Sequence, residues 1–460
     1  YAFDVLMQIY EAAGYSRREA AKSILEHNIY GLDIDDRAFQ LAYFAVMMKA
    51  RQYNRRILNG EADCHVYAIQ ESNNINRNQL KYFGAGLSEL EKNDAMNQMG
   101  GLLDTFVDAK EYGSILNVEP YNWSLLHRFA AETSEAGQMS LDSIGVKATK
   151  EQLQLLTEIG QTLAQKYDVV VTNPPYMVLS SGNSNLNEYA KIYYPDSKYD
   201  LFAMFIERCK QMTCSSRFFS MITQQAWMFQ PSFSHLRNKL YNITTVNMLH
   251  LGARAFDEIA GEVVQTTSFI YLNLAMNNYN SLYVRLVNKN GETAKESAFF
   301  DDSNRFVAKH ELFIKIPNGP IAYWVSANFA GIFSNESIGK YSISDGQTKT
   351  GNNDKYMRNI WEVRSDLIGN GNRWELIAKG GPFRKWAGNV KMVIDWSEGA
   401  RRHYRHDKVA RIAPEYIWFR KGVCWNHIAG TNFAARYLND DSLFETAAPA
   451  IFFKVHKSNT

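Results

Sequence analysis

The sequence predicts an α/β fold, in which largely parallel strands are joined by helices, followed by a separate, irregular and mostly-β region. Two patterns predict this division. Up to about residue 335, segments with apolar residues at helical spacing alternate with short runs of β-branched and aromatic residues, which is typical of parallel strands linked by crossover helices. Beyond that point Gly, Asn, Trp and basic residues dominate without helical periodicity, which indicates short strands and turns.

The first part of the sheet domain, residues 1–75, shows this alternation. Its predicted elements are a helix at 1–14, a helix from Ser16 to about Glu26, a strand at 28–35, a helix at 37–52 and a strand at 64–72. Ser16 and Glu19 form a capping-box pattern that begins the second helix. The third helix is apolar on most of its sides, so we expect other parts of the protein to cover it.

The pattern weakens between residues 76 and 165, where mostly helical sequence carries about 12 acidic and 5 basic side chains over residues 87–165. We interpret this segment as a helical insertion. The α/β pattern resumes over residues 166–335, the remainder of the sheet domain. The predicted elements there are strands at 167–173, 217–229, 244–251 and 263–275, and helices at 200–212 and 232–242.

Charge is unevenly spread along the 460 residues, although the formal net charge is only +2. Residues 340–425 carry about 17 basic and 9 acidic side chains, a local excess of about +8. Such an excess suits a surface that meets a polyanion, although a solvated basic face would give the same count.

The four cysteines, Cys64, Cys209, Cys214 and Cys424, form no CxxC pair and no dense framework. We interpret them as reduced thiols, not as disulfides or zinc ligands, and predict no metal site. We also identify no signal-peptide pattern and no apolar stretch of about 18 residues that could span a membrane. A cytoplasmic protein is therefore expected.

A run of β-branched residues ends in Asn173-Pro174-Pro175-Tyr176, although proline cannot donate to a sheet ladder. The prolines fix φ and hold the residues before them extended, so the turn is stiff. It offers the Asn173 side-chain oxygen and the Pro174 carbonyl as acceptors, beside the flat ring of Tyr176. A planar group bearing an NH2, such as an adenine extruded from a duplex, matches these features. A proline turn that only ends the strand is the plainer alternative.

The two acceptors also suggest a reaction. The exocyclic amine of adenine is a poor nucleophile because its lone pair is delocalised into the ring. Two acceptors on its N–H bonds would draw the nitrogen toward tetrahedral geometry and free the lone pair for attack.

Two earlier strands also end in polar residues, and ligands of open α/β sheets bind outside such carboxyl ends. Asp33 is placed to accept hydrogen bonds from a ribose hydroxyl pair, whereas Asp35 or Asp36 is expected to cap the next helix. Gln70 or Glu71 could contact the adenine amino group of a nucleoside cofactor, or could be an ordinary solvated strand end. All these strand ends are expected along one edge of the sheet.

These motifs resemble a known family. The stretches that carry the resemblance are "GLDID", "HVYAIQES", "YDVVVTNPPYM", "ITQQAWMF", "AFDEIAGEVVQTTSFIYLN", "GQTKTGNNDKYMRNIWEV", "KGGPFRKWAGN" and "KGVCWNHIAG". They resemble the gamma-type N6-adenine DNA methyltransferases, in particular the large methyltransferases of BREX phage-defence systems and related fused restriction-modification enzymes. The resemblance covers most of the chain outside residues 76–160.

The resemblance implies a Rossmann-like class I methyltransferase sheet, and a DNA target-recognition region at 336–460. It implies that S-adenosylmethionine binds at the carboxyl edge of the sheet and that its methyl group passes directly to N6 of a flipped adenine in double-stranded DNA. Other proteins of the defence system are further expected partners. The implied catalytic residues are Asn173, Pro174, Pro175 and Tyr176, and the implied cofactor-binding residues are Asp33, Ile34, Gln70 and Glu71.

The DNA-binding residues expected in the recognition region are interleaved with Gly and Asn, as suits loops that approach phosphates and base edges. They are Lys349, Lys355, Arg358, Arg384, Lys385 and Trp386. For an individual lysine or arginine among them, a solvated basic face is the alternative.

Other interpretations stay open. A non-catalytic DNA-binding or specificity fragment would need only the basic region. Protein glutamine side chains and amino groups of RNA bases also suit such a proline turn, although the long sequence after residue 335 argues against these substrates. We identify no paired cluster of acids and lysine of the nuclease type.

The family's glycine-rich loop embraces the methionine part of the cofactor and is expected just before the opening helix, where this sequence starts. Without the backbone donors of that loop, we expect poor cofactor affinity. Titration calorimetry of the 460-residue chain with S-adenosylmethionine should therefore give weak binding or none, and tight binding would contradict the expectation.

Overall fold

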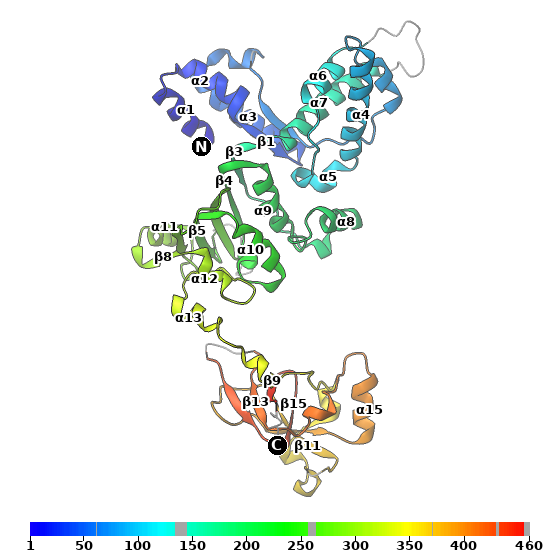
Figure 1. The fold of residues 1–460 in the computed structure, drawn as a ribbon, viewed down its shortest axis with the longest axis vertical. Helices are drawn as coiled ribbons and strands as arrows, with labels where there is room; N and C mark the ends of the chain where they lie inside the picture. The colour runs from blue at the N-terminus through cyan, green and yellow to red at the C-terminus, as the bar shows by residue number, and fades with distance from the viewer. Residues whose placement is uncertain (61, 134–144, 256–263, 370, 429–431, 455–460) are drawn as a thin grey trace, which may run out of the picture. The chain divides into compact units, whose positions relative to one another are not determined.

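The structure is a computed structural model that describes residues 1–460 except 61, 134–144, 256–263, 370, 429–431 and 455–460. Two compact units form, Tyr1–Ala330 and Gly331–Thr460 (Figure 1). The motif expected at 255–273 lies partly outside the described residues, because these exclude 256–263. Among the described helices, none has both the length and the apolar character needed to cross a membrane.

A six-stranded sheet supports much of the first unit. Its strands are β3 (Tyr167–Thr172), β4 (Thr213–Gln224), β5 (Thr244–Gly252), β6 (Thr266–Leu272), β7 (Ser281–Arg285) and β8 (Arg305–Ala308), in the spatial order β3-β4-β6-β5-β7-β8. The pairs β3–β4 and β5–β7 are parallel, and the other pairs are antiparallel. The sheet is therefore mixed, where the sequence pattern predicts largely parallel strands.

Helices α9 (Leu201–Met212) and α10 (Ser234–Leu240) share one apolar core with this sheet. The strand predicted at 217–229 begins earlier and ends at Gln224, because the chain turns there into a short helix that buries Trp227 in the same core. Arg237 of α10 is also fully buried, and it donates hydrogen bonds to four backbone carbonyls of neighbouring loops.

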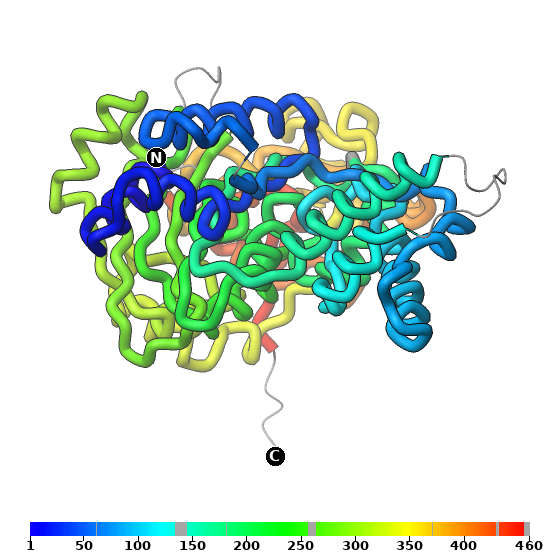
Figure 2. The backbone as a smooth tube through the Cα atoms, turned by 90° about the horizontal axis from the view of Figure 1, so that it is seen from above, coloured from blue at the N-terminus to red at the C-terminus, as the bar shows by residue number. Residues whose placement is uncertain are grey.

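A second, two-stranded parallel sheet contains β1 (Tyr30–Asp33) and β2 (His65–Ala68). Helices α1 (Ala2–Ala12), α2 (Arg17–Ser23) and α3 (Asp36–Tyr53) lie together in both views (Figures 1 and 2) and share a core that includes Phe3, Met7, Ile24 and Met47. The Ser16 side chain accepts a hydrogen bond from the Glu19 N–H, which confirms the predicted helix start.

The two sheets share no ladder among the described strands, although the sequence pattern predicts one continuous sheet. β1 pairs only with β2, and β3 only with β4. The free edges of β1 and β3 line one pocket, and Val169 and Val171 of β3 are 58% and 69% exposed. Neighbouring strands of one sheet must lie within hydrogen-bonding distance of each other. β1 and β3 do not pair directly, and no described strand lies between them to connect the two sheets.

Helix α3 also differs from expectation. It buries Met47 and Ala50 but leaves Leu41 and Phe44 exposed, so the prediction that other parts of the protein cover most of its sides is wrong for the described residues. Among the described residues, α3 packs against α1, α2, β1 and β2 and buries only Met47 and Ala50, so its other apolar side chains stay in solvent or are partly buried.

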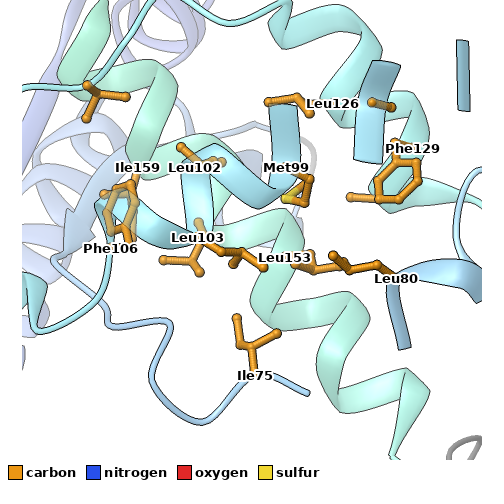
Figure 3. Packing of buried hydrophobic residues seen from close by; sticks show 14 of the residues in the cluster. Ile75, Leu80, Met99, Leu102, Leu103, Phe106, Leu126, Phe129, Leu153 and Ile159 are labelled. Atoms are coloured by element: carbon orange, nitrogen blue, oxygen red, sulfur yellow. The ribbon is translucent and has the colours of Figure 1, made fainter. Parts of the chain in front are cut away.

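The described part of residues 76–165 contains four α-helices: α4 (Glu89–Thr105), α5 (Ala109–Tyr112), α6 (Trp123–Ala131) and α7 (Val146–Ala164). Figure 3 shows their apolar side chains meeting in one core, with Met99, Leu102, Phe129 and Leu153 among them. Ile69, which follows β2, belongs to the same core. This shared core ties the helices to the carboxyl end of β2.

The described residues of the second unit form two four-stranded sheets, of order β10-β12-β11-β15 and β14-β13-β16-β9. Their strands are β9 (Ser342–Ile343), β10 (Met357–Asn359), β11 (Trp374–Ala378), β12 (Met392–Asp395), β13 (Gly422–Trp425), β14 (Ala435–Leu438), β15 (Ser442–Phe444) and β16 (Ala450–Phe453). Helix α15 (Glu398–His406) accompanies them and is absent from the prediction. It buries only Ala400 and Tyr404, too few residues to give a periodic apolar pattern.

Candidate functional site

The turn Asn173–Tyr176 follows directly on the last residue of β3. Asn173 and Pro175 are exposed, Pro174 is buried and Tyr176 is partly buried. The Tyr176 hydroxyl lies 3.5 Å from the Asn173 side-chain oxygen, to which it can donate a long hydrogen bond. An amide oxygen and an aromatic ring therefore lie together at the end of a strand, the pair that an amine-bearing planar ligand would need.

The ring of Tyr176 packs against α9. It meets Phe202 edge to face, with 6.1 Å between ring centroids and 85° between the ring planes. Burial raises the pKa of Tyr176 to about 12, so its hydroxyl stays protonated at neutral pH. The side chain is a neutral ring with a hydrogen-bond donor, not a titrating group.

Asp200 anchors the chain just after this turn. It is the N-cap of α9, and its Oδ1 accepts hydrogen bonds from the N–H groups of Phe202 (3.3 Å) and Met177 (3.2 Å). The Leu201 N–H donates back to the Met177 carbonyl at 3.0 Å. The segment that carries Tyr176 is thus fixed to the start of α9. An aspartate before an apolar helical run is a recognisable N-cap signal, but only the tertiary structure shows that it also binds Met177.

At the end of β1, Asp33 forms a local turn. Its Oδ1 accepts a hydrogen bond from the Asp35 N–H at 2.9 Å, and Asp35 in turn caps α3 by accepting from the Arg37 N–H at 2.7 Å. Of the two expected capping residues, Asp35 is therefore the cap. Asp33 and Ile34 are both exposed, so a carboxylate and an apolar side chain are available at this strand end.

Gln70 and Glu71 lie at the neighbouring end of β2 and are engaged by protein groups. The Gln70 Nε2 donates to Asp36 Oδ1 (3.3 Å), and Glu71 Oε1 accepts from the Lys110 N–H (3.2 Å). The Lys110 Nζ donates to Asp36 Oδ2 at 3.0 Å and, chiefly through this hydrogen bond, lowers the pKa of Asp36. No sequence signal identifies Lys110, because tertiary packing of α5 brings it to this edge.

One pocket connects the two strand ends. Leu32 near the end of β1 and Thr172 at the end of β3 both line it, together with Arg208 of α9. Its volume is about 150 Å³, below the roughly 300–1,000 Å³ of typical ligand sites. Asp33 and Ile34 are exposed and follow Leu32 in sequence, but they do not line this pocket, and the described residues do not enclose a space large enough for a whole nucleoside cofactor.

The expected DNA-binding residues all lie in the second unit. Lys349 pairs through its backbone with Arg411, and the Lys355 Nζ lies 5.0 Å from the centre of the Tyr356 ring. Arg358 Nη1 donates to the backbone carbonyls of Asp354 and Met357, so this guanidinium is already partly engaged. The other three, Arg384, Lys385 and Trp386, are exposed on a single loop.

The family model described as Eco57I restriction-modification methylase matches residues 27–256 of the chain. The chain belongs to this methylase family. The matched range contains Asp33, Gln70, the turn at Asn173–Tyr176 and Asp200, and it ends before the second unit.

Two curated relatives extend the similarity. The "Adenine-specific methyltransferase PglX" of Lacticaseibacillus casei (strain Zhang) is 36% identical over 99% of this chain, and the "Adenine-specific methyltransferase BrxX" of Escherichia coli O9:H4 (strain HS) is 36% identical over 98%. The chain spans 39% of the length of each relative. Among solved structures, the restriction-modification enzyme LlaBIII bound to DNA matches the whole chain and 31% of its own, with 10% identity and a TM-score of 0.42.

The Asp200 anchor can be tested by stability measurements on this methylase chain. Asp200→Ala removes the acceptor for two N–H groups, so the free energy of unfolding of the first unit should fall by about 1–2 kcal/mol. Asp200→Asn keeps a capping oxygen and should cost less. Urea denaturation, read out by hydrogen exchange at the α9 amides, measures both. Equal losses in the two variants would contradict a role for the oxygen.

The same anchor gives a pH dependence. Burial raises the pKa of Asp200 above its ordinary value of 3.8 in the folded protein, so the folded state holds the proton at pH values where the unfolded state has released it. Wild-type stability should therefore fall, relative to Asp200→Asn, as the pH rises from about 3.8 through the folded pKa. The assignment would be contradicted if the free energy of unfolding of the wild type, minus that of Asp200→Asn, stayed constant or increased over this pH range.

Proposed function

We propose that the protein containing this chain transfers a methyl group from S-adenosylmethionine to N6 of an adenine in DNA. The observation that carries the proposal is the turn Asn173–Tyr176, where an exposed amide oxygen and a partly exposed aromatic ring stand side by side at the end of β3. Membership of the Eco57I methylase family and the names of the two relatives support the reaction type.

In this proposal the turn activates the amine by holding it. The Asn173 side-chain oxygen and the Pro174 carbonyl accept the two N–H groups of N6, which directs the nitrogen lone pair away from the ring. Tyr176 stacks on the base, and base stacking on an aromatic side chain contributes about 1–3 kcal/mol. Pro174 and Pro175 restrict the backbone, so the two acceptors are already oriented and little conformational entropy is lost when the base binds.

The cofactor would lie at the carboxyl edge of β1 and β2. Asp33 has an exposed carboxylate that can accept from ribose hydroxyl groups, and Ile34 offers an apolar surface to a purine ring. When bound, S-adenosylmethionine supplies an electrophilic methyl group on sulfur. The Gln70 Nε2 and the Glu71 Oε1 already bind Asp36 and the Lys110 N–H, so the Gln70 Oε1 and the Glu71 Oε2 would be the atoms that accept from the adenine amine of the cofactor.

DNA is the proposed partner of the second unit. The local excess of about +8 over residues 340–425 and the exposed side chains of Lys349, Lys355, Arg384 and Lys385 suit a phosphate backbone. Several other cations of this unit are neutralised by exposed ion pairs, such as Arg364 with Asp366 and Arg405 with Glu415. The unpaired part of the charge is what DNA would meet.

Substitution of the proposed acceptor tests the reaction. In the full-length protein, Asn173→Ala should lower the rate of methyl transfer by about 100-fold or more, the range seen when one positioned hydrogen-bonding group is removed from an active site. Transfer is measured with radiolabelled S-adenosylmethionine and DNA, and the methylated base by sequencing N6-methyladenine. Asn185→Ala, which changes an exposed asparagine of α8 (Ser184–Tyr193), is the control and should keep full activity. Normal activity of Asn173→Ala would refute the mechanism, and label in protein or RNA but not DNA would refute the substrate.

Removal of charge tests the DNA contact. The triple variant Lys349→Ala, Lys355→Ala, Arg384→Ala should weaken DNA binding and reduce the slope of log K against log salt by up to about 3, because each phosphate contact contributes about 0.9. Fluorescence anisotropy at several salt concentrations gives the slope. Arg364→Ala, whose guanidinium is paired with Asp366, should change it little. An unchanged slope in the triple variant would remove these residues from the interface.

A further inference from the structure

An exposed loop between β11 and β12 combines aromatic and basic side chains. Residues 380–389, Gly-Gly-Pro-Phe-Arg-Lys-Trp-Ala-Gly-Asn, form this loop, here called the wedge loop. Its Phe383 is 51% exposed and its Trp386 is 73% exposed, and the exposed Arg384 and Lys385 stand between them. A large apolar side chain that stays in solvent does not contribute the free energy that its burial would give. Two such side chains on one short loop are therefore a candidate contact surface for a ligand.

The start of the wedge loop is held by two asparagines. The Asn426 Nδ2 donates to the Gly381 carbonyl at 2.6 Å, and the Asn389 Nδ2 donates to the Pro382 carbonyl at 3.1 Å. Asn426 is itself fixed from the core, because Arg436, which is almost fully buried, donates from Nη1 to the Asn426 Oδ1 at 2.6 Å. The loop therefore begins from a backbone fixed to the core of the unit.

The far side of the wedge loop is fixed at Trp386 itself. The Trp386 N–H donates to the Ala435 carbonyl at 3.2 Å, and the Trp386 carbonyl accepts from the Tyr437 N–H at 2.8 Å. Trp386 has φ = 76°, in the left-handed region that bulky residues rarely adopt. The two bonds to β14 hold this uncommon conformation, and the side chain they present remains exposed instead of folding back onto the sheet.

The two basic residues of the loop directly precede Trp386 in the sequence. The Lys385 Nζ lies 5.0 Å from the centre of the Trp386 ring. Gly388 has φ = 125°, and a Cβ at this position would come within 3.2 Å of the Arg384 Cγ, so the glycine leaves room for the arginine stem. Lys385 is thus held over the exposed Trp386 ring, and Arg384 lies in the same loop with its stem beside Gly388.

We propose that the wedge loop inserts into duplex DNA, with Trp386 stacking between bases, Phe383 beside it, and Arg384 and Lys385 binding the flanking phosphates. The inference rests on DNA being the substrate of the proposed function and assigns a distinct task to one loop. Rigid apolar wedges that separate base steps are a known way for proteins to open or bend DNA, and an aromatic ring gives up little conformational entropy when it stacks. The two adjacent cations can neutralise phosphates of nucleic acid, whereas a neutral apolar partner would leave them without a counter-charge.

Stacking and charge leave different signatures in binding data. Loss of a stacked ring weakens binding by a similar factor at every salt concentration, whereas loss of a phosphate contact changes the slope of log K against log salt. In the full-length protein, Trp386→Ala should raise the Kd about 10-fold with an unchanged slope. The double variant Arg384→Ala, Lys385→Ala should instead reduce the slope by roughly 2.

The experiment uses a duplex selected from a random library by binding to the wild-type protein, so it does not depend on methylation. Permanganate reactivity of thymines in the complex reports unstacked steps. Wild type should give reactive thymines, Trp386→Ala should lose them, and Trp386→Phe should restore most of the signal and affinity. Trp361→Ala is the matched control: Trp361 is 74% exposed in the same unit but is followed by the acidic Glu362, and its removal should change neither readout.

Affinity and thymine reactivity that are unchanged in Trp386→Ala would overturn the proposal, as would an equal loss in Trp361→Ala. Radiolabelled methyl transfer by the wild-type protein is measured separately. A wild type that binds and opens DNA but transfers no methyl group contradicts the proposed function and leaves the wedge intact, and the reverse result contradicts only the wedge.

Discussion

The arrangement at the end of β3 depends on how the backbone from Asn173 to Met177 is held. Two prolines remove the N–H groups that would otherwise extend a ladder, so the strand must stop and its last residues need other anchors. Asp200 supplies one by accepting hydrogen bonds from Met177 and from the first turn of α9. The same helix places Phe202 against the Tyr176 ring. The end of β3, the position of the Tyr176 ring and the start of α9 therefore depend on the same few contacts.

Buried polar side chains fix loops in the same manner elsewhere in the protein. Arg237 is fully buried, and among the described residues its side chain donates to four backbone carbonyls, those of Trp227, Gln230, Asn318 and Gly319. In the second unit, Arg436 and Asn426 form a chain that ends at the Gly381 carbonyl. A buried polar group is costly unless it is satisfied, so the four hydrogen bonds of Arg237 define one loop conformation more sharply than apolar packing would. In Arg436 the Nη1 is bonded to Asn426, whereas Nε and Nη2 have no hydrogen-bond partner among the described residues. Loops held in this way can carry exposed functional groups without collapsing.

The sequence predicts those features that depend on local chemistry. The proline turn after a β-branched strand, the Ser16 helix start and the acids at the end of β1 all lie where their local patterns place them. Features that depend on distant partners are missed. Periodicity cannot show that Leu41 and Phe44 of α3 are exposed, that Lys110 reaches Asp36, or that β1 and β3 each have an edge without a partner among the described strands. The nine-residue α15 escapes detection because arginines and histidines fill positions that a longer amphipathic helix would give to apolar residues.

The chemistry of the turn explains why its rigidity matters. Asn173 and the proline carbonyls do not titrate, and burial raises the pKa of Tyr176 to about 12, so no group of the turn can act as a general base near neutral pH. In the proposed reaction the turn must then work by orientation alone, and the proton released from N6 passes to another group or to water. Orientation is effective only when the acceptors are already in place before the base arrives, since effective molarity falls steeply with misplacement. An aspartate at position 173 could take up the proton but would add a charge that the exposed turn must keep solvated. An amide held by two prolines, with the segment that follows it fixed by a buried N-cap, meets the same geometric requirement without a change of charge.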